Sequence, residues 1–129
     1  MTLDRKYLVW ALAYLVIGLC VGIFMAASHR HGQSDAHAHI LLAGFVLSFV
    51  YGMIHRLWLR QPDPTLARAQ FIIHQAAAMA LSAGLLLLYG PNLVPDASLE
   101  PLLGIASAGV LIGAVLMFYM VLRSRPGGT

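Results

Sequence analysis

The sequence predicts an all-α protein, an integral membrane four-helix bundle whose N- and C-termini both lie in the cytoplasm. Three observations predict this fold: an apolar composition, four apolar segments of membrane-spanning length, and basic residues gathered on one side of those segments. Hydrophobic residues make up 60% of the 129 residues and charged residues 10%, whereas soluble domains average roughly 45–50% and 25%. A chain of this length builds one domain, so residues 1–129 are predicted to form a single four-helix transmembrane domain.

The first two predicted helices cover residues 7–27 and 38–58. The first is longer than the roughly 7–15 apolar residues of a signal peptide, so we expect it to be retained as a membrane helix. The sequence His-Arg-His-Gly at 29–32 separates it from the second. Each segment has about the 20 residues that cross the hydrocarbon core of a bilayer.

The third and fourth predicted helices cover residues 69–90 and 102–122. A Pro-Asp-Pro sequence at 62–64 precedes the third and Gly-Pro-Asn at 90–92 ends it; both are typical of turns. Because lipid offers no hydrogen-bond partner, the backbone N–H and C=O groups of each apolar segment must bond to one another. A helix forms all of these hydrogen bonds within the segment.

The basic residues predict the orientation of the bundle. Arg30 lies on one side of the segments, and seven basic residues lie on the other: Arg5, Lys6, Arg56, Arg60, Arg68, Arg123 and Arg125. Cytoplasmic loops carry an excess of Lys and Arg, so both termini and the 59–66 connection are predicted to be cytoplasmic, in the inner (cytoplasmic) membrane of a cell. The expected partner of the chain is the lipid bilayer. The gathering of basic residues on one side of the membrane explains the net charge of +3, so no nucleic-acid partner is expected.

Small residues recur at four-residue spacing in every predicted helix. The stripes are Gly18/Gly22/Ala26, Gly44/Ser48/Gly52, Ala76/Ala80/Gly84 and Gly109/Gly113. Such stripes let helices, or a flat cofactor, approach closely. Four helices of this length enclose little interior, so we expect some stripes to form a subunit interface in a homo-oligomer, most simply a dimer.

Six histidines are the strongest candidates for a functional site: His29, His31, His37, His39, His55 and His74. Imidazole is a ligand for haem iron, copper and zinc, and ionisable groups at membrane depth mark functional sites. His29 and His31 also suit an ordinary interfacial loop, and His74 could simply bond one helix to another.

The helical repeat sorts the histidines of the second segment. His37 and His55 are eighteen positions apart and therefore share a face of a regular helix, together with the Gly44/Ser48/Gly52 stripe. His39 points roughly 160° away from that face. The pattern predicts an outer site around His37 and an inner site around His55 and His74.

Residues 35–45, Asp-Ala-His-Ala-His-Ile-Leu-Leu-Ala-Gly-Phe, resemble the start of the second helix of haem-copper oxidase subunit I. In that family a similar sequence supplies a ligand to a low-spin haem. The chain is also similar, over residues 7 to 90, to small four-helix membrane proteins that resemble cytochrome c oxidase subunit I. The matching parts are the His-Ala-His sequence at 37–39, Arg-Leu at 56–57, and Ala-Arg-Ala-Gln-Phe at 67–71 with His74.

The resemblance implies a haem b protein in which His37 binds the iron and His39 and His74 belong to the site. It implies electron transfer or redox sensing, with a respiratory-chain electron donor or acceptor as partner. Oxidase subunit I carries a further helix with partner haem and copper histidines, which this chain lacks, so oxygen reduction by this chain alone is not expected. Whether the chain serves an oxidoreductase system stays open.

Two alternatives remain open from the sequence. The first is a copper- or zinc-binding membrane protein that uses the outer histidines His29, His31, His37 and His39, with Asp35 or Met25 assisting. The second is a structural accessory subunit of a respiratory complex, whose histidines only bond helices together. No catalytic residues are predicted, because all five acidic residues lie in predicted loops or chain ends.

Overall fold

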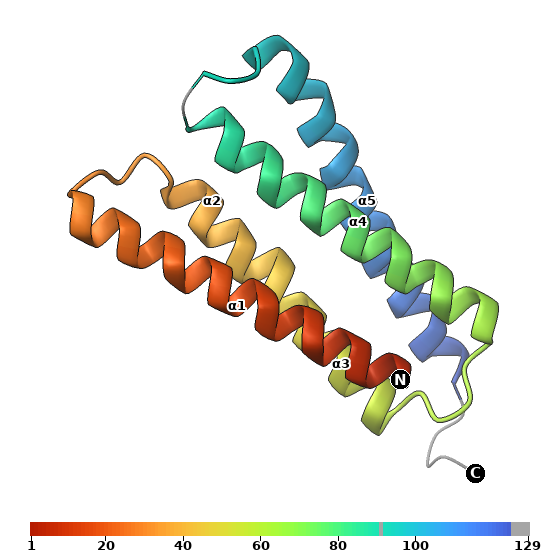
Figure 1. The fold of residues 1–129 in the computed structure, drawn as a ribbon. Helices are drawn as coiled ribbons and strands as arrows, with labels where there is room; N and C mark the ends of the chain where they lie inside the picture. The colour runs from red at the N-terminus through yellow and green to blue at the C-terminus, as the bar shows by residue number, and fades with distance from the viewer. Residues whose placement is uncertain (91, 125–129) are drawn as a thin grey trace.

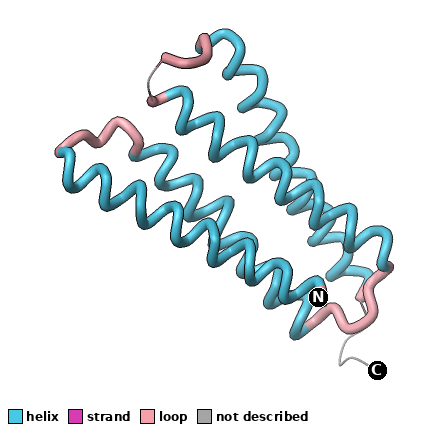
Figure 2. Tube along the Cα trace, viewed as in Figure 1, coloured by secondary structure: helices cyan, strands magenta, loops and turns pink. Residues whose placement is uncertain are grey.

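The computed structural model describes residues 1–90 and 92–124. Within these residues it contains four helices that are long and apolar enough to cross a membrane, as predicted. They are α1 (Leu3–Ser28), a composite second helix over Ser34–Leu57, α4 (Pro64–Leu88) and α5 (Asp96–Arg123). Figure 2 shows helix and loop along the whole described trace, and no strand.

The helices begin earlier than the hydropathy of the segments predicted. α4 begins at Pro64, five residues before the predicted start, because the Asp63 side chain accepts a hydrogen bond from the Thr65 backbone N–H and caps the first turn. Pro64 occupies the first helical position, where its missing N–H costs nothing. Polar capping turns lower the local hydropathy, so a search for apolar runs misses them.

The expectation of a regular second helix is wrong over seven residues. This helix consists of α2 (Ser34–His39), a π-helix η1 (Ile40–Val46) and α3 (Leu47–Leu57). A π-helix bonds each N–H five residues back instead of four, and such segments are rare and frequent at functional sites. Here it follows directly after His37 and His39, and it changes the angle between them and the rest of the helix.

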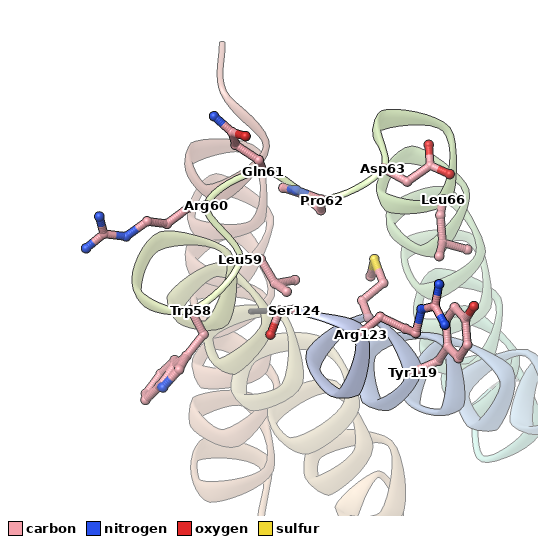
Figure 3. Close-up of a pocket in the computed structure, with 11 residues that line it drawn as sticks. Trp58, Leu59, Arg60, Gln61, Pro62, Asp63, Leu66, Tyr119, Arg123 and Ser124 are labelled. Carbon is pink, nitrogen blue, oxygen red and sulfur yellow. The ribbon is translucent and has the colours of Figure 1, made fainter. Parts of the chain in front are cut away.

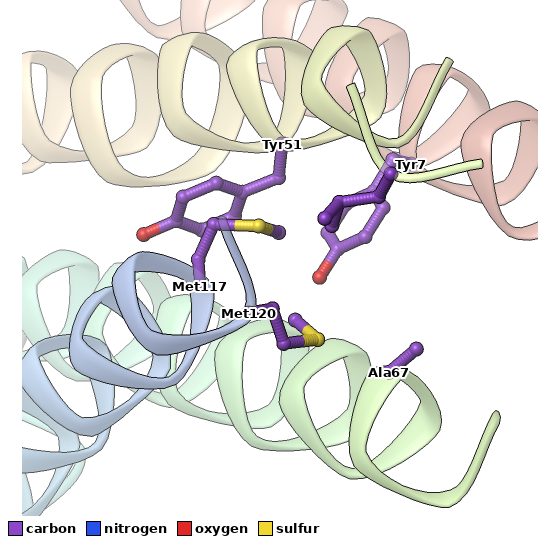
Figure 4. Close-up of a cluster of buried hydrophobic side chains, with 6 residues drawn as sticks. Tyr7, Tyr51, Ala67, Met117 and Met120 are labelled. Atoms are coloured by element: carbon purple, nitrogen blue, oxygen red, sulfur yellow. The ribbon is translucent and has the colours of Figure 1, made fainter. Parts of the chain in front are cut away.

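The helices form two hairpins that lie side by side (Figure 1). α1 packs along the composite helix and α4 packs along α5. At the end where α1 begins and α5 ends, one buried cluster joins all four helices (Figure 4): Tyr7, Tyr51, Leu59, Ala67, Met117 and Met120. A second buried cluster, which includes Ala36, Leu81 and Ala106, joins the other end.

The surface of the bundle is apolar along α1 and α5, where many large hydrophobic side chains are exposed. Such faces suit lipid or another membrane helix. The described chain ends lie at the same end of the bundle as the α3–α4 connection (Figure 1), so six of the basic residues gather there. Arg125, the seventh, lies outside the described residues.

Candidate functional site

The six histidines occupy three kinds of environment. His29, His31 and His39 are exposed near the end of the bundle formed by the α1–α2 connection. His29 ends α1 in the left-handed backbone region, with φ of 56°. His37 is half-buried, while His55 and His74 are buried, the latter completely.

His37 turns its imidazole toward α1. Its Nδ1 lies 2.8 Å from the Gly18 carbonyl oxygen, and because a carbonyl only accepts, Nδ1 must carry the proton. Nε2 then keeps its lone pair, the arrangement found in histidines that bind metals. Gly22 makes room for the ring, since a Cβ there would lie 3.0 Å from His37 Cε1.

His39 has the same tautomer for a different reason. Its Nδ1 donates to the Asp35 carbonyl oxygen at 2.8 Å, one turn earlier on its own helix. Nε2 is therefore also available, but it belongs to an exposed side chain. Within one chain, His37 faces α1 and His39 faces outward.

The Gly44/Ser48/Gly52 stripe does not provide the open face that the sequence suggested. A Cβ on Gly44 would lie 2.5 Å from the Tyr14 ring, and one on Gly52 would lie 3.1 Å from Tyr7 Cβ. These two glycines admit α1 itself. A macrocycle over the stripe would have to displace both tyrosines.

His74 lies at the junction of the two hairpins. Its Nε2 is 3.3 Å from the Ser48 hydroxyl oxygen, which also accepts a hydrogen bond from Gln75 Nε2 at 3.0 Å. The Tyr51 ring stands edge-on to the imidazole, with centroids 4.9 Å apart. α5 approaches from the other side, where a Cβ on Gly113 would lie 3.3 Å from His74 Cβ. His74 therefore contacts two neighbouring helices.

Several buried polar atoms, some of them at this junction, have no hydrogen-bond partner among the described residues. They are Tyr51 OH, His55 Nε2, His74 Nδ1, Gln75 Oε1 and Ser82 Oγ. Buried polar groups are almost always bonded, and exceptions need an explanation such as a functional role or a bound ion or ligand. The seam between the hairpins is therefore a candidate polar site.

His55 and His74 are linked through two tyrosines. The His55 ring stacks on Tyr7 at 5.6 Å, Tyr7 meets Tyr51 edge-on at 5.9 Å, and Tyr51 contacts His74. The Tyr7 hydroxyl also donates to Gln70 Oε1, while Gln70 Nε2 donates to the Gly113 carbonyl oxygen at 3.1 Å. The predicted inner histidines thus belong to one network of rings and amides.

The structure does not bring His37 and His74 to one point. Ser48, the neighbour of His74, follows His37 by eleven residues, or roughly 16 Å along a helix. One iron cannot take both side chains in this arrangement. Among the described residues, no three side chains of His, Cys, Asp or Glu lie close enough to share a metal ion.

Sequence reasoning missed Tyr7, Tyr51, Gln70 and Gln75 as parts of the inner network. One signal was present: Gln70 and His74 are four positions apart in an apolar segment, so they share a helix face. Polar amides at membrane depth are costly unless bonded, which marks both glutamines as contact residues.

At the opposite end of the bundle, a hydrogen bond joins the α1–α2 connection to the end of α4. Gln33 Nε2 donates to the Leu86 carbonyl oxygen at 3.1 Å. Tyr89 follows α4, and hydrogen bonding to the Asp35 carboxylate, with its negative charge, raises the pKa of the Tyr89 hydroxyl. This contact therefore stabilises the protonated hydroxyl of Tyr89, which is the form that can donate a hydrogen bond.

Two hollows flank the α3–α4 connection. A cavity of about 800 Å³ lies between this connection and the end of α5 (Figure 3). In that view the Arg60 guanidinium points away from Arg123. The second hollow is an open groove of about 1000 Å³ between the start of α1, the end of α3 and the start of α4.

Comparisons with known protein families, with curated proteins and with solved structures found no match to this chain.

Proposed function

We propose that this chain is a haem b-binding integral membrane protein in which His37 is an axial ligand of the iron. In this proposal the four helices cross the cytoplasmic membrane with both chain ends on the cytoplasmic side. The protein transfers electrons or senses redox state, with a respiratory-chain component as donor or acceptor.

One observation carries the proposal: the backbone carbonyl of Gly18 holds His37 in the tautomer that leaves Nε2 free. Metal-binding histidines are commonly oriented in this way, by a hydrogen bond from the other ring nitrogen to a backbone carbonyl or carboxylate. The likeness of residues 35–45 to a haem-ligand sequence adds independent support. The π-helix that begins three residues after His37 is a further feature typical of functional sites.

The residues present fit a haem ligand at His37 and leave the opposite ligand to be identified. Haem iron bound by two imidazoles supports one-electron transfer. In this chain the Gly18 carbonyl orients the ligand, and the absence of a side chain on Gly22 admits the imidazole. His39, exposed and in the same tautomer, suits the opposite ligand only when it comes from a second copy of the chain.

The test is the replacement of His37 by alanine. The purified His37→Ala variant should lose most of its haem, because removal of the imidazole removes the bond from protein to iron. His31→Ala is the matched control, since His31 is exposed in the loop outside the matching sequence. Equal haem content and an unchanged spectrum in His37→Ala would refute the assignment of the ligand.

These two variants, together with His29→Ala, separate haem from the copper or zinc alternative. A metal site built from the outer histidines would lose its ion in His29→Ala and His31→Ala as well as in His37→Ala. An accessory subunit without a cofactor would show neither iron nor copper nor zinc in the parent protein.

A further inference from the structure

The groove between the start of α1, the end of α3 and the start of α4 carries a concentration of positive charge. Four basic side chains line it, together with a single carboxylate, that of Asp4. The basic residues are Lys6, Arg56, Arg60 and Arg68. The groove lies at the end of the bundle that carries the chain termini, which is the predicted cytoplasmic face.

Among the residues that the structure describes, most of this charge is not neutralised. Arg56 Nη1 pairs with Asp4 Oδ2 at 3.4 Å, which accounts for the one carboxylate. In the part of the chain that the structure describes, no carboxylate pairs with Lys6, Arg60 or Arg68. All three side chains are exposed and therefore free to turn toward an anion in the groove.

A buried polar atom adds a second, independent indication of a ligand. His55 lines the groove and is only 8% exposed. Its ring stacks on Tyr7, and its Nε2 is a buried atom with no hydrogen-bond partner among the described residues. A headgroup oxygen that enters beside the His55 ring would supply the missing partner for that nitrogen.

Apolar side chains also line the groove, and those on α4 extend it toward the middle of the bundle. Leu59, Phe71 and Ile72 line it beside the basic residues, and Ile72 is exposed on the outside of the bundle. A ligand with a charged phosphate and hydrocarbon chains matches both halves of this lining. A free phosphate ion matches only the basic half.

We propose that this groove binds the phosphate headgroup of an anionic phospholipid, with Lys6, Arg60 and Arg68 around the phosphate and His55 Nε2 bonded to a headgroup oxygen. The acyl chains lie along Phe71 and Ile72 in the membrane. Basic pockets between helices at the cytoplasmic face are suited to such headgroups, and charge-assisted bonds from Arg to phosphate are strong and directional. The proposal concerns a site separate from His37 and does not depend on haem.

The test measures lipid binding to the purified full-length protein in mild detergent by native mass spectrometry. Dioleoylphosphatidylglycerol, dioleoylphosphatidylcholine and inorganic phosphate are titrated separately. The parent protein should bind one phosphatidylglycerol in preference to phosphatidylcholine. The triple variant Lys6→Gln/Arg60→Gln/Arg68→Gln should bind it about a hundredfold more weakly, since each basic side chain contributes roughly fivefold.

The matched control removes three positive charges outside the groove, as Arg5→Gln/Arg30→Gln/Arg123→Gln. It should bind phosphatidylglycerol within about twofold of the parent protein, because none of these side chains lines the groove. An equal loss in both triple variants would overturn the site in favour of general surface charge. Equal binding of phosphatidylcholine would overturn the choice of an anionic headgroup.

Two further measurements examine the remaining parts of the proposal. His55→Phe keeps a ring beside Tyr7 but removes Nε2, and it should weaken phosphatidylglycerol binding several-fold; unchanged binding would overturn the role of His55. Protection by inorganic phosphate against thermal unfolding, equal to that by phosphatidylglycerol at the same concentration, would overturn the lipid in favour of a free anion.

Discussion

Gly22 is the residue that most directly controls the position of the His37 imidazole. Gly22→Leu should drive the ring away from the Gly18 carbonyl, because even a Cβ at position 22 would lie 3.0 Å from His37 Cε1. Loss of the hydrogen bond that orients a metal ligand costs about 10–100-fold in affinity. Haem content and the visible spectrum of the purified variant measure this effect.

Gly104→Leu is the matched control, since a Cβ at this exposed position of α5 meets nothing within 4 Å. It should retain the spectrum of the parent protein. If Gly22→Leu also retains both haem and spectrum, the orientation of His37 by Gly18 has no bearing on binding.

His74 should matter for the stability of the bundle. His74→Ala removes the partner of Ser48 and the ring that packs against Tyr51. We expect a loss of about 1–3 kcal/mol in the free energy of unfolding, as for other buried hydrogen-bonded groups. Denaturant unfolding in mixed micelles measures it.

The resemblance adds a second expectation for the same variant, a lower haem content. His29→Ala, at an exposed position, controls for both effects. A variant as stable as the parent protein and with full haem content would show that His74 serves neither purpose.

At the scale of the elements, the π-helix is the feature with the clearest consequence. Insertion of one alanine after Leu42, an exposed residue of η1, exceeds the one extra residue that the π-helix accommodates and should rotate His37 by roughly 100° relative to α3. His37 would then leave the Gly18 carbonyl. We expect loss of haem with the helix content retained, measured by visible absorption and circular dichroism.

Leu42→Ala, which keeps the number of residues in η1, should behave like the parent protein. Full haem binding after the insertion would show that the register of η1 does not set the position of the ligand.

The sequence predicted the four helices because lipid-compatible length and composition leave little choice of structure. It did not predict η1, since an extra residue per turn produces no change in hydropathy. It also did not predict which groups pack against Gly44 and Gly52. Small residues permit close approach, but the pattern on one helix cannot reveal whether a cofactor or the Tyr14 and Tyr7 rings of another helix fill the space.

The candidate site was predictable in part. The histidines stand out in an apolar chain, and the depth of His74 in its segment indicates burial. The partners of His74 come from two neighbouring helices, α3 and α5, and the rotation of one helix against another is set by packing, not by the spacing of residues within either. Tyr51, and the hydrogen bond of Gln75 to Ser48, therefore became visible only in three dimensions.

At the scale of the whole molecule, the distribution of basic residues predicts the orientation in the membrane. Single cysteines at Ser34 and Ala97, introduced into a Cys20→Ser protein, should react with an impermeant thiol reagent added to intact cells. Cysteines at Thr65 and Ser124 should stay protected until the cells are opened. The four positions lie in pairs at opposite ends of the bundle, so the reverse labelling pattern would invert the orientation.

A visible absorption spectrum of the purified parent protein, combined with its iron-to-protein ratio, examines the proposed function as a whole. Ligation by histidine in a membrane haem protein predicts a sharp haem absorption band that shifts on reduction, and iron in a simple ratio to the chain. The His37→Ala variant should lose both signals. A colourless, iron-free protein, purified from cells supplied with haem, would contradict the haem proposal; bound copper or zinc in its place would favour the outer histidine site.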